Sequence, residues 1–84
     1  MPEFYGQDDH DPYVQWLQNH PDGYVLQFNQ NSDVKLHRAS CRHIGGGGAV
    51  PPSGTIWTTY RKRCSEDRAA LLAASNQQCG SCSP

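Results

Sequence analysis

Four residues of this chain have the types and the spacing of metal ligands. His37 and Cys41 form an H-x3-C pair within the stretch LHRASCRHI, and Cys79 and Cys82 form a C-x2-C pair in the stretch QQCGSCSP. Two thiolates separated by two residues can reach one ion from a single turn, and structural zinc favours a tetrahedral Cys3His set. The spacing therefore predicts one Zn2+ site made of His37, Cys41, Cys79 and Cys82.

Cys64 and His43 are rival candidates for a place in this site. Cys64 lies between a predicted strand and a predicted helix, where a small buried thiol is an ordinary core residue. His43 borders a glycine-rich loop, so we expect its side chain to be exposed to solvent. His10 and His20 lie in polar loop contexts and are not expected to bind an ion. Either Cys64 or His43 remains an alternative to one of the four predicted ligands.

Two disulfides are the alternative use of the four cysteines. The stretch MPEFYGQDDHDPY contains no basic segment followed by an apolar run, so we expect no secretory signal. No stretch approaches the roughly 20 apolar residues of a membrane span. We therefore expect a cytoplasmic protein that does not contact a membrane, and in a reducing compartment such cysteines bind metal more often than they pair.

The size of the chain also favours a metal as a staple. A chain of 84 residues buries only about 60% of its unfolded surface, so its core is marginal without additional support. Hydrophobic residues make up 36% of the sequence, and eight glycines and six prolines dilute the core further. A bound zinc ion would supply part of the missing stability.

A short helix is predicted near the start of the chain. Asp11 can cap it, and Tyr13, Trp16 and Leu17 share one face at helical spacing. The residue before Pro21 is pushed out of helical geometry, so the helix should end near residue 19. Residues 1–10 before it are polar, and we expect them to form a disordered lead-in.

The remaining elements alternate between strands, loops and one further helix. Residues 24–29 and 33–38 show the period-two pattern of a β-hairpin with one buried face. Residues 45–54 form a glycine-rich loop, residues 55–60 favour a third strand, and residues 65–75 favour a helix that Ser65 caps. The sequence predicts one α+β domain over residues 11–84, stapled by zinc, with a three-stranded antiparallel sheet and two helices.

The run from YVLQFNQNSDVKLHRASCRHI through TIWTTYRKRCSEDRAALLAASNQQCGSC resembles the metal-binding domain of the Ada DNA-repair protein. It is more similar still to small Ada-like zinc modules, and the resemblance covers about residues 23–82. It implies a small α+β fold in which zinc joins the end of the hairpin to the segment after the last helix. The implied ligands are His37, Cys41, Cys79 and Cys82.

One departure from the family pattern bears on chemistry. In the Ada repair domain, the first ligand of the x3 pair is the cysteine whose zinc thiolate accepts a methyl group from a DNA phosphotriester. His37 occupies that position here, and a zinc-bound imidazole has no thiolate to alkylate. A site with four protein ligands also leaves no open position for a catalytic water. We expect a structural metal and no enzyme activity, with a thiol methyl acceptor as the less favoured alternative.

The distribution of charge suggests a partner. Residues 1–33 contain six acidic residues and no Lys or Arg, whereas residues 34–84 contain seven basic and two acidic residues. A basic patch beside a helix start can bind phosphates, so we expect DNA or RNA as the leading partner. The alternative is that the two halves pair with each other. The candidate nucleic-acid contacts are Arg38, Arg42, Arg61, Lys62 and Arg63.

A protein-interaction or accessory module without nucleic-acid binding is the second hypothesis. Trp16 and Trp57 would then be exposed anchors for a protein partner, whereas the simpler expectation for Trp57 is packing against the second helix. Binding to phosphates should weaken steeply as salt rises, and aromatic docking should barely respond.

Overall fold

A β-hairpin forms the middle of the fold. In the computed structural model, which describes residues 1–84, β2 (Tyr24–Phe28) and β3 (Val34–Arg38) pair antiparallel with Leu26 opposite Leu36. This confirms the predicted hairpin. The strands lie within the residue ranges that the period-two pattern predicted, since successive side chains of a strand point to opposite faces of the sheet.

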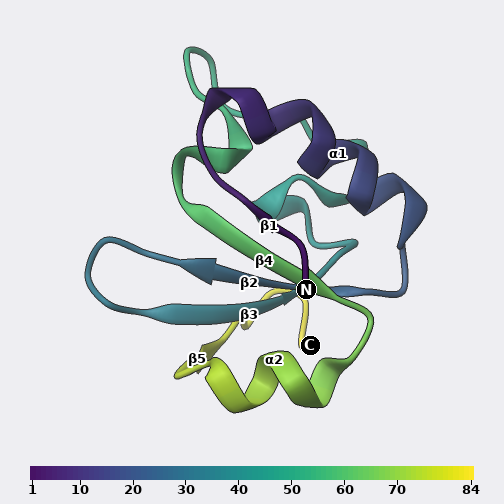
Figure 1. Ribbon diagram of the computed structural model, residues 1–84, viewed down its shortest axis with the longest axis vertical. Helices are drawn as coiled ribbons and strands as arrows, with labels where there is room; N and C mark the ends of the chain where they lie inside the picture. Colours follow the sequence, from purple (N-terminus) through teal and green to yellow (C-terminus); the bar gives the residue numbers. More distant parts are fainter.

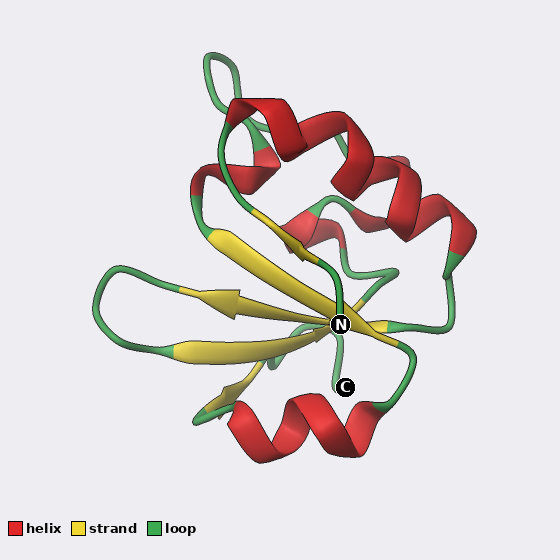
Figure 2. Ribbon diagram, viewed as in Figure 1, coloured by secondary structure: helices red, strands yellow, loops and turns green.

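The hairpin belongs to a five-stranded mixed sheet, so the predicted α+β class is confirmed and the predicted three-stranded antiparallel sheet is not. The strand order is β1-β4-β2-β3-β5; all neighbours pair antiparallel except β3 and β5, which are parallel. Helix α1 covers one face of the sheet and α2 the other (Figures 1 and 2). The other elements are β1 (Glu3–Phe4), α1 (His10–Asn19), β4 (Arg61–Ser65), α2 (Arg68–Ala74) and β5 (Gln77–Gln78).

Each face of the sheet has its own hydrophobic core. On the α1 face, Val25 belongs to a buried cluster with Tyr13 and Cys64. On the α2 face, Leu26 packs in a second cluster with Leu36 and Leu71. The prediction that the hairpin buries one face is therefore incomplete, because α2 covers the face that would otherwise meet solvent.

The two helices differ in how closely they follow their predicted limits. Helix α1 ends at Asn19, as predicted, and it buries Tyr13 and Leu17. Its start differs from the prediction, because it begins at His10 after the N-cap Asp9, so Asp11 lies inside the helix and is not its cap. Helix α2 begins later than predicted, at Arg68, because Asp67 is its N-cap and accepts a hydrogen bond from the Ala70 amide at 3.3 Å. The predicted Ser65 cap is wrong.

The predicted third strand at residues 55–60 is displaced. Residues Trp57–Thr59 form a 3-10 turn, and the strand is β4, in which Cys64 lies opposite Val25. The basic run Arg61, Lys62 and Arg63 conceals the alternation, since Lys62 points inward and is only 1% exposed. Its ammonium donates hydrogen bonds to the Trp57 carbonyl at 2.6 Å and the Tyr60 carbonyl at 3.0 Å.

The first ten residues contain structure that differs from the expected disordered lead-in. Strand β1 pairs with β4, with Glu3 opposite Arg63. The Cys64 amide donates to the Pro2 carbonyl at 2.9 Å, and the Gly6 amide donates to the Thr58 carbonyl at 2.9 Å. These bonds connect the start of the chain to β4 and to the turn before it.

Buried Lys62 gives the protein a testable dependence on pH. Burial lowers the pKa of Lys62 from 10.5 to about 8, so between these values the unfolded chain binds more protons and stability rises with pH. A Lys62→Met chain lacks this gain, although it also loses two hydrogen bonds. We expect the free energy of unfolding of the wild type, relative to Lys62→Met, to increase by about 2 kcal/mol between about pH 7 and pH 9.5.

Urea unfolding of both chains at several pH values measures this difference. Burial raises the pKa of Cys64 to about 12, although the charge of Lys62 acts to lower it. The folded thiol stays protonated up to about pH 9.5 in both chains, so the loss of stability that it causes at high pH nearly cancels in the comparison. A difference that stays constant over this pH range would contradict the prediction.

Candidate metal centre

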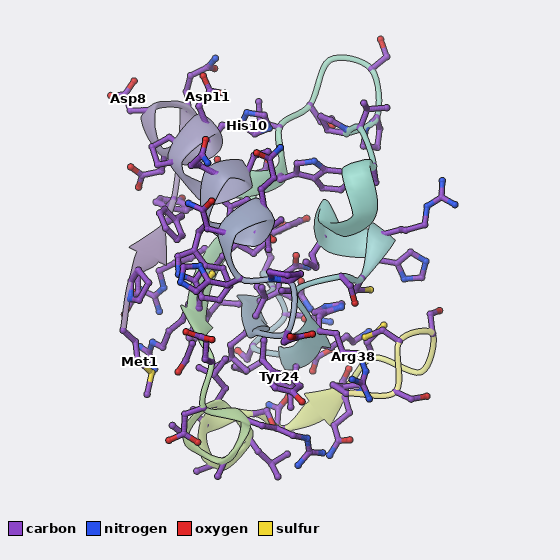
Figure 3. The ribbon with its side chains drawn as sticks, turned by 90° about the vertical axis from the view of Figure 1, so that its right-hand side faces the viewer. Met1, Asp8, His10, Asp11, Tyr24 and Arg38 are labelled. Carbon is purple, nitrogen blue, oxygen red and sulfur yellow. The ribbon has the colours of Figure 1, made fainter.

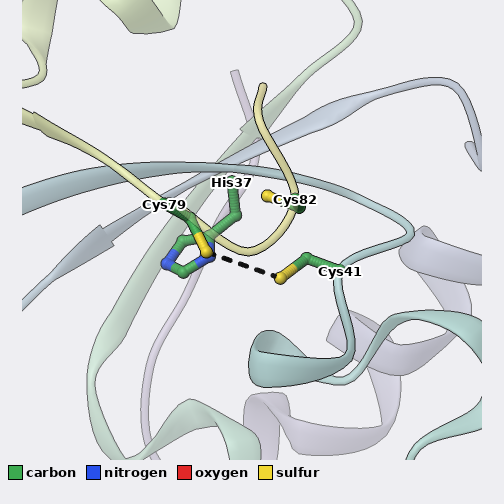
Figure 4. A group of neighbouring side chains, drawn as sticks. All are labelled: His37, Cys41, Cys79 and Cys82. Atoms are coloured by element: carbon green, nitrogen blue, oxygen red, sulfur yellow. Dashed lines mark hydrogen bonds between the residues drawn. The ribbon is translucent and has the colours of Figure 1, made fainter.

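The four predicted ligands converge on one point of the structure. One donor atom from each of His37, Cys41, Cys79 and Cys82 lies within 4.8 Å of all the others. The first three are buried, and Cys82 is partly exposed. Figure 4 shows the four side chains directed toward a common centre. These residues can therefore hold a metal ion.

His37 and Cys79 are brought together by a parallel strand pair. His37 lies on β3, and β5 pairs with β3 so that Gln78 lies opposite Leu36. The Cys79 amide continues this ladder by donating to the Leu36 carbonyl at 2.9 Å. The strand that positions Cys79 was not predicted, because it is only two residues long and both of them, Gln77 and Gln78, are polar and exposed.

Cys41 and Cys82 reach the same centre from two turns. The Cys41 amide donates to the Arg38 carbonyl at 2.9 Å, closing a turn at the end of β3. The Arg38 amide donates to the Cys82 sulfur at 3.3 Å, and its guanidinium donates to the Cys82 carbonyl at 2.9 Å. Arg38 therefore fixes the segment that carries Cys82 against the hairpin.

The sulfur spacing fits a tetrahedral ion better than a disulfide. The Cys41 and Cys79 sulfurs are 3.9 Å apart, and a tetrahedral zinc with Zn–S bonds of 2.3 Å places two sulfurs about 3.8 Å apart. A disulfide needs an S–S bond of about 2.05 Å. All four cysteines are free, so the structure does not contain the alternative of two disulfides.

The buried ring nitrogens of His37 lack a polar partner, and a metal ion would supply one. Neither ring nitrogen has a hydrogen-bond partner, although both are buried, and such groups usually cost about 1–3 kcal/mol. Burial, followed by the charges of Lys35 and Lys62, lowers the pKa of His37 to about 4. The ring is therefore neutral at physiological pH, which is the form that binds metals.

The thiols differ in their electrostatic environments. Burial raises the pKa of Cys41 to about 12. Burial also acts to raise the pKa of Cys79, but hydrogen bonds from the Cys82 amide, the His43 ring and the Ser81 amide lower it to about 6. The turn of the C-x2-C pair therefore favours the thiolate form of Cys79 at neutral pH. The thiol of Cys41 stays protonated unless a bound cation lowers its pKa.

The two rivals for coordination lie outside the four. Cys64 is fully buried in the core on the α1 face, as expected for a structural thiol. His43 is exposed, as expected, but its Nδ1 atom lies 3.9 Å from the Cys79 sulfur. Such outer contacts tune metal affinity. The proximity of His43 to this site was not predicted, because the contact depends on the fold of the chain between residues 43 and 79.

The predicted basic patch is divided between three environments. Lys62 is buried and does not reach the surface. Arg61 and Arg63 lie over the Phe28 ring and form ion pairs with Glu3 at 3.6 and 3.1 Å. The other two residues, Arg38 and Arg42, are exposed and flank the predicted ligand Cys41.

The two tryptophans are not fully exposed. Trp16 and Trp57 are partly buried and pack against the core on the α1 face. Trp57 therefore packs on the opposite side of the sheet from the second helix, against which it was expected to lie.

Neither helix is long and apolar enough to cross a membrane.

Comparison with known proteins gives no match: no protein family, no curated protein and no solved structure is significantly similar to this chain.

Proposed function

We propose that this protein is a zinc-stapled binding module whose metal has a structural role. The observation that carries the proposal is the convergence of His37, Cys41, Cys79 and Cys82 within 4.8 Å. A set of three thiolates and one imidazole favours zinc over the harder cations, which prefer oxygen ligands. A zinc ion held there would contribute free energy to folding.

The position of the donors supports a structural role over a catalytic one. They connect β3, the turn after it and the segment after β5, so an ion bound by all four would join the hairpin to the last part of the chain. Four protein ligands fill a tetrahedral site and leave no position for a reacting water. His37 in place of a thiolate further disfavours methyl transfer.

We extend the proposal to a relation with the Ada-like zinc modules. The order β2, β3, Cys41, β4, α2 and the C-x2-C pair supports this relation. Strand β1 and helix α1 lie outside the segment that resembles those modules, and α1 contributes Tyr13 and Leu17 to the core that contains Cys41 and Cys79.

Native mass spectrometry of protein purified without added metal tests the site. We expect one zinc ion per chain and no mass loss from disulfides. His37→Ala should retain much less zinc, because it removes a ligand. His43→Ala should retain the ion, since outer-sphere substitutions typically lower metal affinity by about 10- to 100-fold only. Equal retention by the two variants, or a mass lower by about four hydrogens without metal, would overturn the site.

We further propose that the module binds nucleic acid through Arg42 and Arg38. Arg42 is exposed, and its side chain forms no hydrogen bond or ion pair, so its guanidinium is free to meet a phosphate. Asp8 and Asp11 lie at the top of the molecule in the view of Figure 3, well away from Arg38. The alternative of docking through exposed tryptophans has less support, because both tryptophans pack against the core.

Binding of labelled DNA and RNA across a range of salt concentrations tests this proposal. Arg42→Gln should weaken binding and reduce the slope of log K against log salt by about 1, as loss of one phosphate contact predicts. Arg68→Gln is a matched control, since it removes the same charge from α2, where Arg68 donates to the Pro84 carbonyl. Equal effects of both substitutions would indicate a response to net charge alone and contradict a site at Arg42.

A further inference from the structure

A second surface feature lies away from the metal centre, where the start of β4 meets the chain after β1. A pocket of about 350 Å3 is lined by Tyr5, Phe28, Gln30, Thr59, Tyr60 and Arg61. This volume falls within the range of small-molecule sites, roughly 300–1,000 Å3. The pocket is separate from the four metal donors, none of which lines it.

The residue types that line the pocket indicate which ligands it can bind. Three of the six residues are aromatic, two carry an amide or a hydroxyl, and one is an arginine. None is acidic and one is a cation, which disfavours a cation as the occupant. Aromatic faces stack on flat rings, whereas amide and hydroxyl groups hydrogen-bond to ring edges.

Tyr5 is exposed but held on a fixed backbone. Its side chain is 64% exposed, while its amide donates to the Asp9 carboxylate at 2.9 Å. Strand β1 precedes it, and the Gly6 amide after it donates to the Thr58 carbonyl. Because the backbone on both sides of Tyr5 is already fixed, little backbone entropy is lost when the ring binds a ligand.

Buried Lys62 fixes the opposite side of the pocket. Its ammonium donates to the Tyr60 carbonyl at 3.0 Å and to the Trp57 carbonyl at 2.6 Å. The backbone that carries Tyr60 and Arg61 is therefore held in place from below.

Arg61 supplies the charge at the rim. Its guanidinium lies 4.3 Å above the centre of the Phe28 ring, and its Nε atom is 3.6 Å from Glu3. The Glu3 carboxylate is closer to Arg63, at 3.1 Å. One carboxylate thus balances two guanidiniums, and the terminal nitrogens of Arg61 remain available for an anion.

We propose that this pocket binds one base of a single-stranded nucleic acid, stacked on the tyrosine rings, with its phosphate at Arg61. The inference rests on the proposed nucleic-acid function and specifies the strand state of the ligand. A base in a duplex is stacked on its neighbours, so only an unpaired base can enter such a pocket. Gln30 offers an amide donor and acceptor to the edge of that base.

The test measures binding of a short labelled oligothymidine and of a matched DNA hairpin to the full chain purified with its metal. Tyr5→Ala should weaken oligothymidine binding by roughly 5- to 100-fold, the range for loss of one base-stacking contact. Tyr5→Phe keeps the stacking face and should bind nearly as well as the wild type. Val50→Ala changes another exposed apolar residue and should have no effect.

The possible failures are distinguishable. If Arg42→Gln weakens binding but Tyr5→Ala does not, the pocket assignment is overturned while the proposed function stands. If no nucleic acid binds, both are overturned. A titration with thymidine monophosphate followed by NMR tests the pocket independently, with shifts expected at the Gln30, Thr59 and Tyr60 amides. Shifts caused by N-acetyltryptophanamide but not by the nucleotide would overturn the inference and assign the pocket to a protein partner.

Discussion

A Cys41→Ala chain is expected to be largely unfolded under conditions in which the wild type is folded. A domain of 84 residues has a total stability of about 4–13 kcal/mol, and structural zinc contributes about 10–16 kcal/mol in zinc-finger peptides. Losing the ion therefore removes as much free energy as the whole domain has. Chelation of the wild type should give the same result, and circular dichroism and the dispersion of amide NMR signals measure both.

Cys64→Ala is the matched control for this experiment. Cys41 and Cys64 are both buried cysteines of the core on the α1 face, but only Cys41 belongs to the four converging donors. Cys64→Ala should cost about 1–2 kcal/mol through lost packing and still bind one ion per chain. If Cys41→Ala keeps native-like NMR dispersion, the metal does not hold the fold together. If Cys64→Ala loses the ion, the proposed ligand set is wrong.

The features predicted correctly from the sequence are those set by local spacing. The hairpin, the end of α1 at Asn19 and the four donors depend on periodicity or on short fixed spacings that are visible in the chain itself. Cys64 was also placed correctly in the core. The hairpin, the end of α1 and the spacing within each ligand pair need no knowledge of distant contacts. The meeting of the two ligand pairs does depend on a distant contact, the pairing of β3 with β5.

The features that the sequence did not reveal depend on partners far away in the chain. Strand β5 has no apolar pattern, and it forms because the Asn76 side chain and backbone both bond to Val34. From the sequence alone, Lys62 is expected at the surface. It can be buried because the fold places two carbonyls within hydrogen-bond distance of its ammonium. Strand β1 likewise forms only when β4 is present to pair with it.

Gly46→Ala is expected to destabilise the protein by more than about 3 kcal/mol and to weaken metal retention, because the added methyl has no space. Gly46 lies in the run expected to be a flexible loop, but it is buried and its amide donates to the Cys41 carbonyl at 2.8 Å. A Cβ atom at this position would lie 2.7 Å from the Cys41 nitrogen and closer still to backbone atoms of Ala39 and Ser40.

Those neighbours are backbone atoms, so no side-chain rotation relieves the clash, and the turn that presents Cys41 must move. Gly80→Ala is the informative control: Gly80 lies between the ligands Cys79 and Cys82, yet a Cβ atom there meets no atom within 4 Å. Thermal unfolding with bound zinc should show a large loss for Gly46→Ala and almost none for Gly80→Ala. The reverse order would mean that the turn at Cys41 tolerates rearrangement and that the metal centre depends chiefly on the C-x2-C pair.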